Sequence, residues 1–589
     1  MILDITMLND GLLCINIHAT KVENYRQQQQ FRGKQIFLFH NHIFWFEPRK
    51  FTILMINKNT RHKKFIDEVD LKSSTIFILL PPLIVFEMHN LSLLIIIPLL
   101  TALAILFFKN PKQVRLVACI GATIQLILSL LLLFAYVNER NVGNTAQMLF
   151  TEKHSWYSAL NIEYYLGVDG ISVAMILLTS FVVLTGILFS WNVVDNAKEF
   201  FFLLVFLSVG AYGFFLSLDL FLMFFFLELA VIPKFLLIGI WGSGKKEYSA
   251  MKLVLMLMGG SALVLIALLG IYFSTPSVDG KHIYDLLSIS KQHIPLDMQM
   301  IFFPLAFLGF GVFTAIFPFH TWAPDGHSSA PTAASMFLAG ISMKLGGYGC
   351  LRVATYLMPE AAKEYSSIII VLATIAIIYG AFATMMQKDL KYINAYSSVS
   401  HCGFVLLGIG MLTKVSINGA VLQMVSHGVM TALFFAAIGM IYERSHTRMV
   451  ADLGGLLKTI PFISAVIFIA GLCSLGLPGL SGFVAEMTVF IGSWQNPDTF
   501  RRIATILGCM SLVVTAVYVL RALGKSVMGP ITNEHFLHLK DATWNEKLAS
   551  AILILAIFAI GCAPFWLNNL ISPDSQIIFD NLSRAGIGL

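Results

Sequence analysis

Apolar runs of roughly 20 residues follow one another from residue 90 to the C-terminal region, separated by shorter polar segments. This is the length that an α-helix needs to cross the hydrocarbon core of a bilayer. The short apolar–polar alternation that marks an outer-membrane barrel is missing from the sequence. The pattern therefore predicts an all-α polytopic membrane protein with about fourteen transmembrane helices. They cover residues 90–108, 114–137, 170–191, 200–217, 219–241, 250–273, 298–319, 332–355, 366–386, 393–413, 417–442, 460–494, 502–524 and 546–569.

Two of the predicted helices contain Pro and Gly together with polar residues. The seventh ends in FPFHTWAPDGHSSAPT (317–332), and the twelfth, too long for one straight crossing, contains LGLPGLSG (475–482). Interrupted helices at corresponding positions are typical of transporters built from inverted repeats, so we expect helices 7 and 12 to be broken. The predicted divisions are helices 1–3 at 88–198, inverted five-helix repeats at 199–355 (helices 4–8) and 366–524 (helices 9–13), and helix 14 at 546–570.

The first 87 residues do not fit this pattern. They are basic, with RHKK at 61–64, and they contain no apolar run of spanning length. Met88 instead begins MHNLSLLIIIPLLTALAILFFKN, which looks like the start of a first membrane helix. We interpret residues 1–87 as an N-terminal extension, either a lineage-specific addition or the product of a start codon set too early.

The composition agrees with the membrane class, since 57% of the residues are hydrophobic and 12% are charged, against about 25% charged in soluble domains. The seven cysteines form no CxxC pair, and no glycine-rich nucleotide motif occurs, so metal and nucleotide sites are not supported. The net charge of +6 lies mostly near helix ends and predicts topology rather than nucleic-acid binding. Lys and Arg favour the loops after odd-numbered helices, so we expect those loops in the cytoplasm and both termini outside.

Ionisable residues inside the apolar runs are the strongest functional signal. A charge at mid-bilayer costs about 2.5–3.5 kcal/mol and usually marks an ion or proton path. Glu228 and Lys234 lie in helix 5, Lys344 in helix 8 and Glu486 in helix 12. Burial lowers the pKa of a lysine and a nearby carboxylate raises it, so a moving carboxylate can load or release its proton. These residue types therefore favour proton handling.

Other polar residues in the runs have structural explanations that compete with functional ones. Asp169 and Asp219 stand at helix starts, where a carboxylate caps backbone N–H groups. A histidine in a membrane helix can titrate near neutral pH, or it can simply hydrogen-bond to a neighbouring helix. The histidines inside spans or at breaks are His320, His327, His401 and His427.

Four longer segments then resemble one known family. They are FPFHTWAPDGHSSAPTAASMFLAGISMKLGGYGCLR (317–352), KDLKYINAYSSVSHCGFVLLG (388–408), LQMVSHGVMTALFFAAIGMIYERSHTR (422–448) and LPGLSGFVAEMTVFIGSW (477–494). Together they resemble the antiporter-like subunits of respiratory NADH:quinone oxidoreductase (complex I), from about Met88 to the C-terminus. Glu486, where related subunits usually have lysine, and the absence of a long lateral helix favour the M type (subunit 4).

The resemblance implies a proton path through Glu228, Lys344, Glu486, His320, His401 and His427. It also implies a lysine on helix 7, seven residues before His320, but Phe313 occupies that position. Lys234 is the unexpected lysine, on helix 5. We predict that it either takes over the missing charge or extends to the membrane surface, and that it belongs to the proton path in the first case.

The resemblance further implies that this chain pumps protons and has no redox cofactor itself. FMN, iron–sulfur clusters and quinone are expected in partner subunits, and L-like and N-like antiporter subunits are expected beside it in the lipid bilayer of a bacterial cytoplasmic (inner) membrane. Nucleic acid is not an expected partner. Alternatives are a subunit of a multisubunit cation/H⁺ antiporter, of a membrane-bound hydrogenase or of a photosynthetic relative, and a structural subunit whose path is closed at Phe313.

Overall fold

The computed structural model describes residues 90–277 and 282–584 in full, and the backbone of four strands near the N-terminus. The chain divides into two units, Met1–Phe86 and Glu87–Leu589. In the first unit, β1 (Leu3–Met7) pairs antiparallel with β2 (Leu13–Ile17), and β3 (Gln35–Phe39) with β4 (His42–Phe46). Met88 and the RHKK segment lie outside the described residues, so the interpretation of residues 1–87 remains a prediction.

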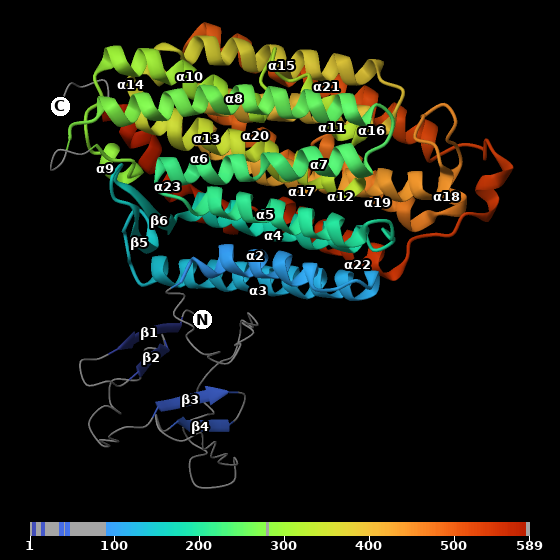
Figure 1. Cartoon of the computed structure of the whole chain (residues 1–589), viewed down its shortest axis with the longest axis horizontal. Helices are drawn as coiled ribbons and strands as arrows, with labels where there is room; N and C mark the ends of the chain where they lie inside the picture. Colours follow the sequence, from blue (N-terminus) through green and yellow to red (C-terminus); the bar gives the residue numbers. More distant parts are fainter. Residues whose placement is uncertain are drawn as a thin grey trace. The chain divides into compact units, whose positions relative to one another are not determined.

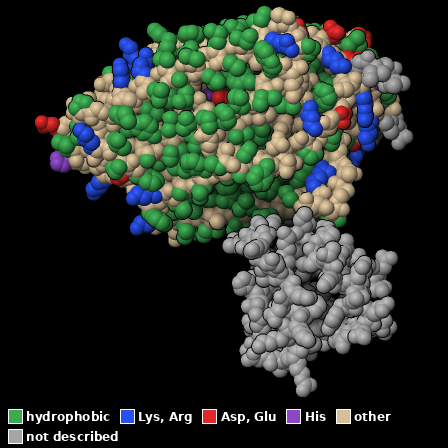
Figure 2. Space-filling model, turned by 180° about the vertical axis from the view of Figure 1, so that it is seen from behind, with side chains coloured by type: hydrophobic (Ala, Val, Ile, Leu, Met, Phe, Trp, Pro, Cys, Tyr) green, Lys and Arg blue, Asp and Glu red, His purple; other side chains and the backbone are tan. Residues whose placement is uncertain are grey.

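The second unit is a bundle of helices that run side by side (Figure 1). Among the described residues, ten candidate spans are long and apolar enough to cross a membrane. They are α3 (Pro111–Asn141), α4 (Gly170–Phe189), α5 (Ala197–Leu216), α6 (Leu220–Leu229) with α7 (Val231–Trp241), α8 (Lys246–Ser274), α10 (Leu296–Thr314), α15 (Ser366–Met386), α17 (Lys414–Ser445), α21 (Thr499–Ser526) and α22 (Trp544–Cys562). Figure 2 shows a broad apolar face with basic side chains gathered toward its ends, as a multi-pass membrane protein requires.

The other four of the fourteen predicted spans fall on helices that are shorter, interrupted or less apolar. One is α2 (Leu93–Leu106), and another is α16 (Leu390–Gly410). The predicted helix 8 is a continuous stretch made of α12 (Thr332–Phe337), the π-helical turn η2 (Leu338–Ser342), α13 (Met343–Gly349) and a second π-helical turn η3 (Cys350–Thr355). The predicted helix 12 consists of α19 (Pro461–Ser474) and α20 (Ser481–Trp494).

Both helices that were predicted to be broken are interrupted where Pro and Gly occur. In helix 7, α10 ends before Ala315, which has a left-handed φ of 65°, and the chain resumes as α11 (Trp322–Ser329). In helix 12, Gly476 and Gly479 between α19 and α20 have φ of 75° and 92°. Glycine adopts these backbone angles without the steric penalty that a Cβ atom brings, which explains why the break lies here.

The prediction of an all-α fold is wrong in the loop between the second and third predicted spans. There β5 (Leu149–Tyr157) and β6 (Ile162–Val168) form an antiparallel hairpin. The strands are rich in aromatic and β-branched residues, which favour extended structure, and Asn161 in the turn has a positive φ. A second unpredicted element follows the last span, where α23 (Phe565–Arg584) packs on α4 and α17.

Candidate functional site

The centre of the bundle holds a lysine in direct contact with a histidine. Lys344 lies on α13, directly after the η2 turn, and its Nζ atom donates a hydrogen bond to the Ala339 carbonyl within that turn. The same Nζ atom is 2.8 Å from Nδ1 of His427 on α17. Both side chains are about 1% exposed. Four of the predicted site residues, beginning with these two, are brought together by α13, α16, α17 and α20.

The contacts continue from His427 to a carboxylate through a second histidine. The rings of His427 and His401 have centroids 5.3 Å apart. Nδ1 of His401 is 3.4 Å from Oε1 of Glu486, and Nε2 of His401 is 3.1 Å from the Ser474 hydroxyl. Ser474 ends α19 and Glu486 lies in α20, so the two halves of the broken helix both face His401. Lys344, His427, His401 and Glu486 thus form one continuous buried row.

Gly476 fixes the position of the Glu486 carboxylate. A Cβ atom at residue 476 would lie 2.5 Å from Oε2 of Glu486, closer than real Cβ contacts allow. The missing side chain therefore lets the carboxylate pack against the break itself. The LGLPGLSG segment supplies both the interruption and the space for the acid.

Glu228 and Lys234 lie on either side of a further, less pronounced helix interruption, at Ala230 between α6 and α7. Lys234 is buried, at 1% exposure, so its Nζ atom is enclosed by the protein and does not extend to the protein surface. It lies 5.9 Å from the centroid of the Phe313 ring on α10. Neither Lys234 Nζ nor Glu228 Oε1 has a hydrogen-bond partner among the described residues.

His320 and His327 lie on the other predicted broken helix but outside the row. His320 stacks on Phe317 at 5.6 Å and packs against Tyr379 of α15 at 4.9 Å. His327 is fully buried beside Trp322 and Phe435. Within the described part of the chain, none of the ring nitrogens of these two histidines has a hydrogen-bond partner.

Both helix-start aspartates cap helices, as predicted. The Asp219 carboxylate accepts a hydrogen bond from the Leu222 N–H, and Asp169 accepts one from the Ser172 N–H. Asp169 has a second role that the sequence analysis missed, since it forms a buried ion pair with Arg352 at the end of the helix-8 stretch. Arg352 follows Lys344 by eight residues, a spacing that signals nothing by itself.

Asp574 on α23 is also missed by sequence, because it follows the last candidate span. Its Oδ2 atom accepts a 2.6 Å hydrogen bond from the Gly170 N–H, at the start of α4. Burial and the neighbouring Asp169 carboxylate raise the pKa of Asp574 to about 8. This acid therefore ties the C-terminal helix to the start of α4, and Arg140 lies 3.9 Å from its other carboxylate oxygen.

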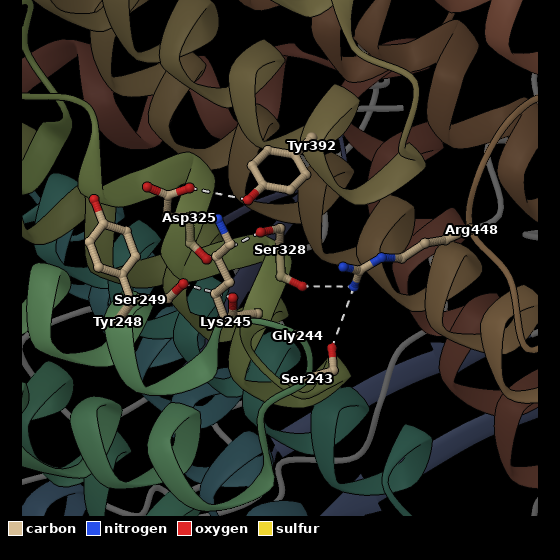
Figure 3. A pocket seen from close by; sticks show the side chains of 10 residues that line it. Ser243, Gly244, Lys245, Tyr248, Ser249, Asp325, Ser328, Tyr392 and Arg448 are labelled. Atoms are coloured by element: carbon tan, nitrogen blue, oxygen red, sulfur yellow. Dashed lines mark hydrogen bonds between the residues drawn. The ribbon is translucent and has the colours of Figure 1, made fainter.

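A polar cavity of about 470 Å³ opens at the ends of α8, α11 and α16 (Figure 3). Tyr392 donates a hydrogen bond to Asp325, which also pairs with Lys252 at 2.7 Å. Arg448 donates to the Ser328 carbonyl. Next to the cavity, the buried Lys391 donates a 2.8 Å hydrogen bond to the Ala330 carbonyl. Lys391 and Arg448 lie in loops between the predicted spans, where basic residues are ordinary, so the sequence alone does not reveal this cavity.

Comparison with known proteins gives one consistent result. A family model described as "NADH:quinone oxidoreductase/Mrp antiporter, TM" matches residues 217–511. NADH-quinone oxidoreductase subunit M of Rickettsia conorii is 36% identical over 494 residues, which cover 82% of this chain and 98% of the relative. NAD(P)H-quinone oxidoreductase chain 4 2 of Picosynechococcus sp. is 36% identical over 80% of this chain and 90% of its own length.

Solved structures share the fold. A chain of respiratory complex I from Thermus thermophilus superposes with a TM-score of 0.76 at 24% identity, covering 84% of this chain and 100% of that one. A chain of the Mrp complex from Dietzia sp. gives a TM-score of 0.73 at 17% identity, with 85% and 98% covered. At these identities the similarity concerns the fold alone.

Proposed function

Because the chain belongs to the NADH:quinone oxidoreductase/Mrp antiporter family of membrane subunits, we propose that it is the M-type proton-translocating subunit of an NADH:quinone oxidoreductase. The observation that supports this most directly is the buried row of Lys344, His427, His401 and Glu486. Each member can take up and release a proton, and each touches the next. FMN, iron–sulfur clusters and quinone belong to partner subunits in this proposal.

The distances along the row support the proposed proton transfer. The 2.8 Å between Lys344 Nζ and His427 Nδ1 is a hydrogen-bond distance, so the ammonium can pass its proton directly to the neutral ring. The two imidazole rings have centroids 5.3 Å apart and are tilted by 32°, so a small ring rotation or one bridging water completes the step. His401 then delivers the proton to Glu486, 3.4 Å away.

The finer architecture is part of the same proposal. Fourteen spans form two inverted five-helix repeats, with the cavity of Figure 3 on the cytoplasmic side and both termini in the periplasm. Water reaching this cavity would lie next to Lys391. We propose Lys391 as a proton-uptake group together with His320, His327, Glu228 and Lys234. L-like and N-like subunits are the expected neighbours in the bacterial cytoplasmic membrane.

A Lys344→Met substitution tests the proposal, because methionine fills a similar volume without a titratable group. In inside-out vesicles of the native membrane we expect NADH-driven proton pumping to fall at least about tenfold, while the complex still assembles. Unchanged pumping in this variant would contradict the proposed path.

The alternative of a cation/H⁺ antiporter is favoured by the fold shared with the Mrp complex. It predicts that sodium added without NADH releases a preformed proton gradient from vesicles. Purification of the native complex gives the second criterion, since redox subunits that co-purify with this chain support the oxidoreductase and their absence supports the antiporter.

A further inference from the structure

Two opposite charges lie near the α6–α7 junction. Lys234 is almost fully buried, and its Nζ atom has no hydrogen-bond partner among the described residues. Glu228 is partly buried, and its enclosed Oε1 atom likewise has no partner there. Removing an ammonium from water costs several kcal/mol unless hydrogen bonds compensate. A group kept in such a state is a candidate for function, because a purely structural role would favour a methionine or leucine.

The surroundings show which interactions hold the Lys234 side chain. Its ammonium lies 5.9 Å from the centroid of the fully buried Phe313 ring, within the range of a cation–π interaction. Its favourable electrostatic interaction is with Glu228. The only ionisable side chain of α10 is Asp297 in the first turn, so α10 presents no cation of its own beside Phe313.

The backbone between the two charges is suited to movement. The helix is interrupted at Ala230, and Pro233 has no N–H to donate to the turn before it. The cation–π contact with Phe313 and the electrostatic attraction to Glu228 offer the ammonium two favourable positions, between which the long, flexible lysine side chain can exchange.

We propose that Lys234 is a proton-carrying residue, held on the face of Phe313 in one position and giving its proton to Glu228 in the other. In the transfer, one N–H bond of the ammonium breaks and one O–H bond forms on the carboxylate, which leaves a neutral amine and a neutral acid. Phe313 positions the cation and does not itself exchange protons. This inference rests on the proposed function, because it adds a step to the same proton path.

Substitutions at Lys234 test the proposal in vesicles of the native membrane. Lys234→Met removes the charge, and Lys234→Arg keeps the charge and the cation–π contact but cannot release a proton. We expect both to lower NADH-driven proton pumping at least about tenfold, with normal amounts of assembled complex. Normal pumping by Lys234→Arg would overturn the proposal, since charge alone would then suffice.

A double variant that moves the lysine from residue 234 to residue 313 tests whether an ammonium is needed in this particular space. Phe313→Lys in the Lys234→Met background puts an ammonium beside the same space from α10, and we expect it to restore pumping. Phe313→Met in that background is the matched control and should restore nothing; equal rescue by both overturns the proposal. Lys344→Met separates this inference from the proposed function. If Lys344→Met loses pumping and Lys234→Met does not, only the role of Lys234 is wrong. If Lys344→Met pumps normally, the proposed function itself is wrong.

Discussion

Nζ of Lys344 and Nδ1 of His427 are 2.8 Å apart in a site from which solvent is excluded. His427→Gln keeps a hydrogen-bonding group near Lys344 but cannot titrate near neutral pH. We expect NADH-driven proton pumping to fall at least about tenfold in membrane vesicles. Cys402, whose sulfur is 4.0 Å from the same ring nitrogen, offers a control, because Cys402→Ser should pump normally. Equal losses of pumping in both variants would indicate that any change in the packing around Lys344 and His427 impairs pumping.

Gly476→Ala should displace the Glu486 carboxylate. A left-handed backbone costs a non-glycine residue about 1–2 kcal/mol, and the new Cβ would also meet Oε2 of Glu486 at 2.5 Å. Gly479→Ala carries similar backbone strain, but nothing lies within 4 Å of its Cβ. We expect both variants to lower thermal stability similarly and only Gly476→Ala to lose proton pumping. Loss of pumping in both variants would show that the effect comes from the helix break between α19 and α20 and not from the position of the Glu486 carboxylate.

The ion pair of Arg352 with Asp169 should contribute strongly to stability. Arg352→Met leaves a buried carboxylate without its partner, which typically costs about 3–5 kcal/mol. Thermal unfolding of the purified complex measures the loss, and Asp169→Asn in the same chain should recover part of it. Lys153→Ala removes the more exposed pairs with Glu163 and Asp285, and it should cost less than about 1 kcal/mol for each pair.

Attachment of α23 should depend on pH. The pKa of Asp574 is raised to about 8 in the docked state, against about 3.9 for a free aspartate. Docking is therefore most stable at low pH, weakens as the pH rises toward 8, and levels off above it. Hydrogen exchange of α23, corrected for the intrinsic rate, should show this decline, and Asp574→Asn should remove it. A pH-independent wild type would mean that this acid is already ionised when docked.

The proposed orientation predicts which side of the membrane exposes each end of the bundle. Lys245→Cys places a thiol at the cavity of Figure 3, and Ser155→Cys places one on the exposed β5–β6 hairpin. In a background without other cysteines, an impermeant maleimide should label the first in inside-out vesicles and the second in spheroplasts. The opposite result would reverse the topology.

Hydropathy predicted the ten long candidate spans because each is a sufficiently long apolar run, and Pro and Gly predicted both breaks. The same reasoning found Lys344 and Glu486, since charges stand out in apolar runs. It missed the β5–β6 hairpin, because pairing between strands depends on neighbours outside each run. It also missed Lys391 and Asp574, which lie at helix ends or beyond the last span, where polar residues are ordinary. Only the tertiary fold shows that they are buried.

The π-helical turn η2 (Leu338–Ser342) helps to set the direction in which the Lys344 side chain points. A π turn holds one residue more than the α-helical turn it replaces, and each residue rotates an α-helix by about 100°. If η2 tightened into regular α-helical geometry without losing a residue, the segment after it would turn by about 100° relative to the segment before it. The Lys344 ammonium would then point away from His427 with every titratable side chain still present. The proposed proton path is therefore vulnerable to a shift in helical phase as well as to loss of charge.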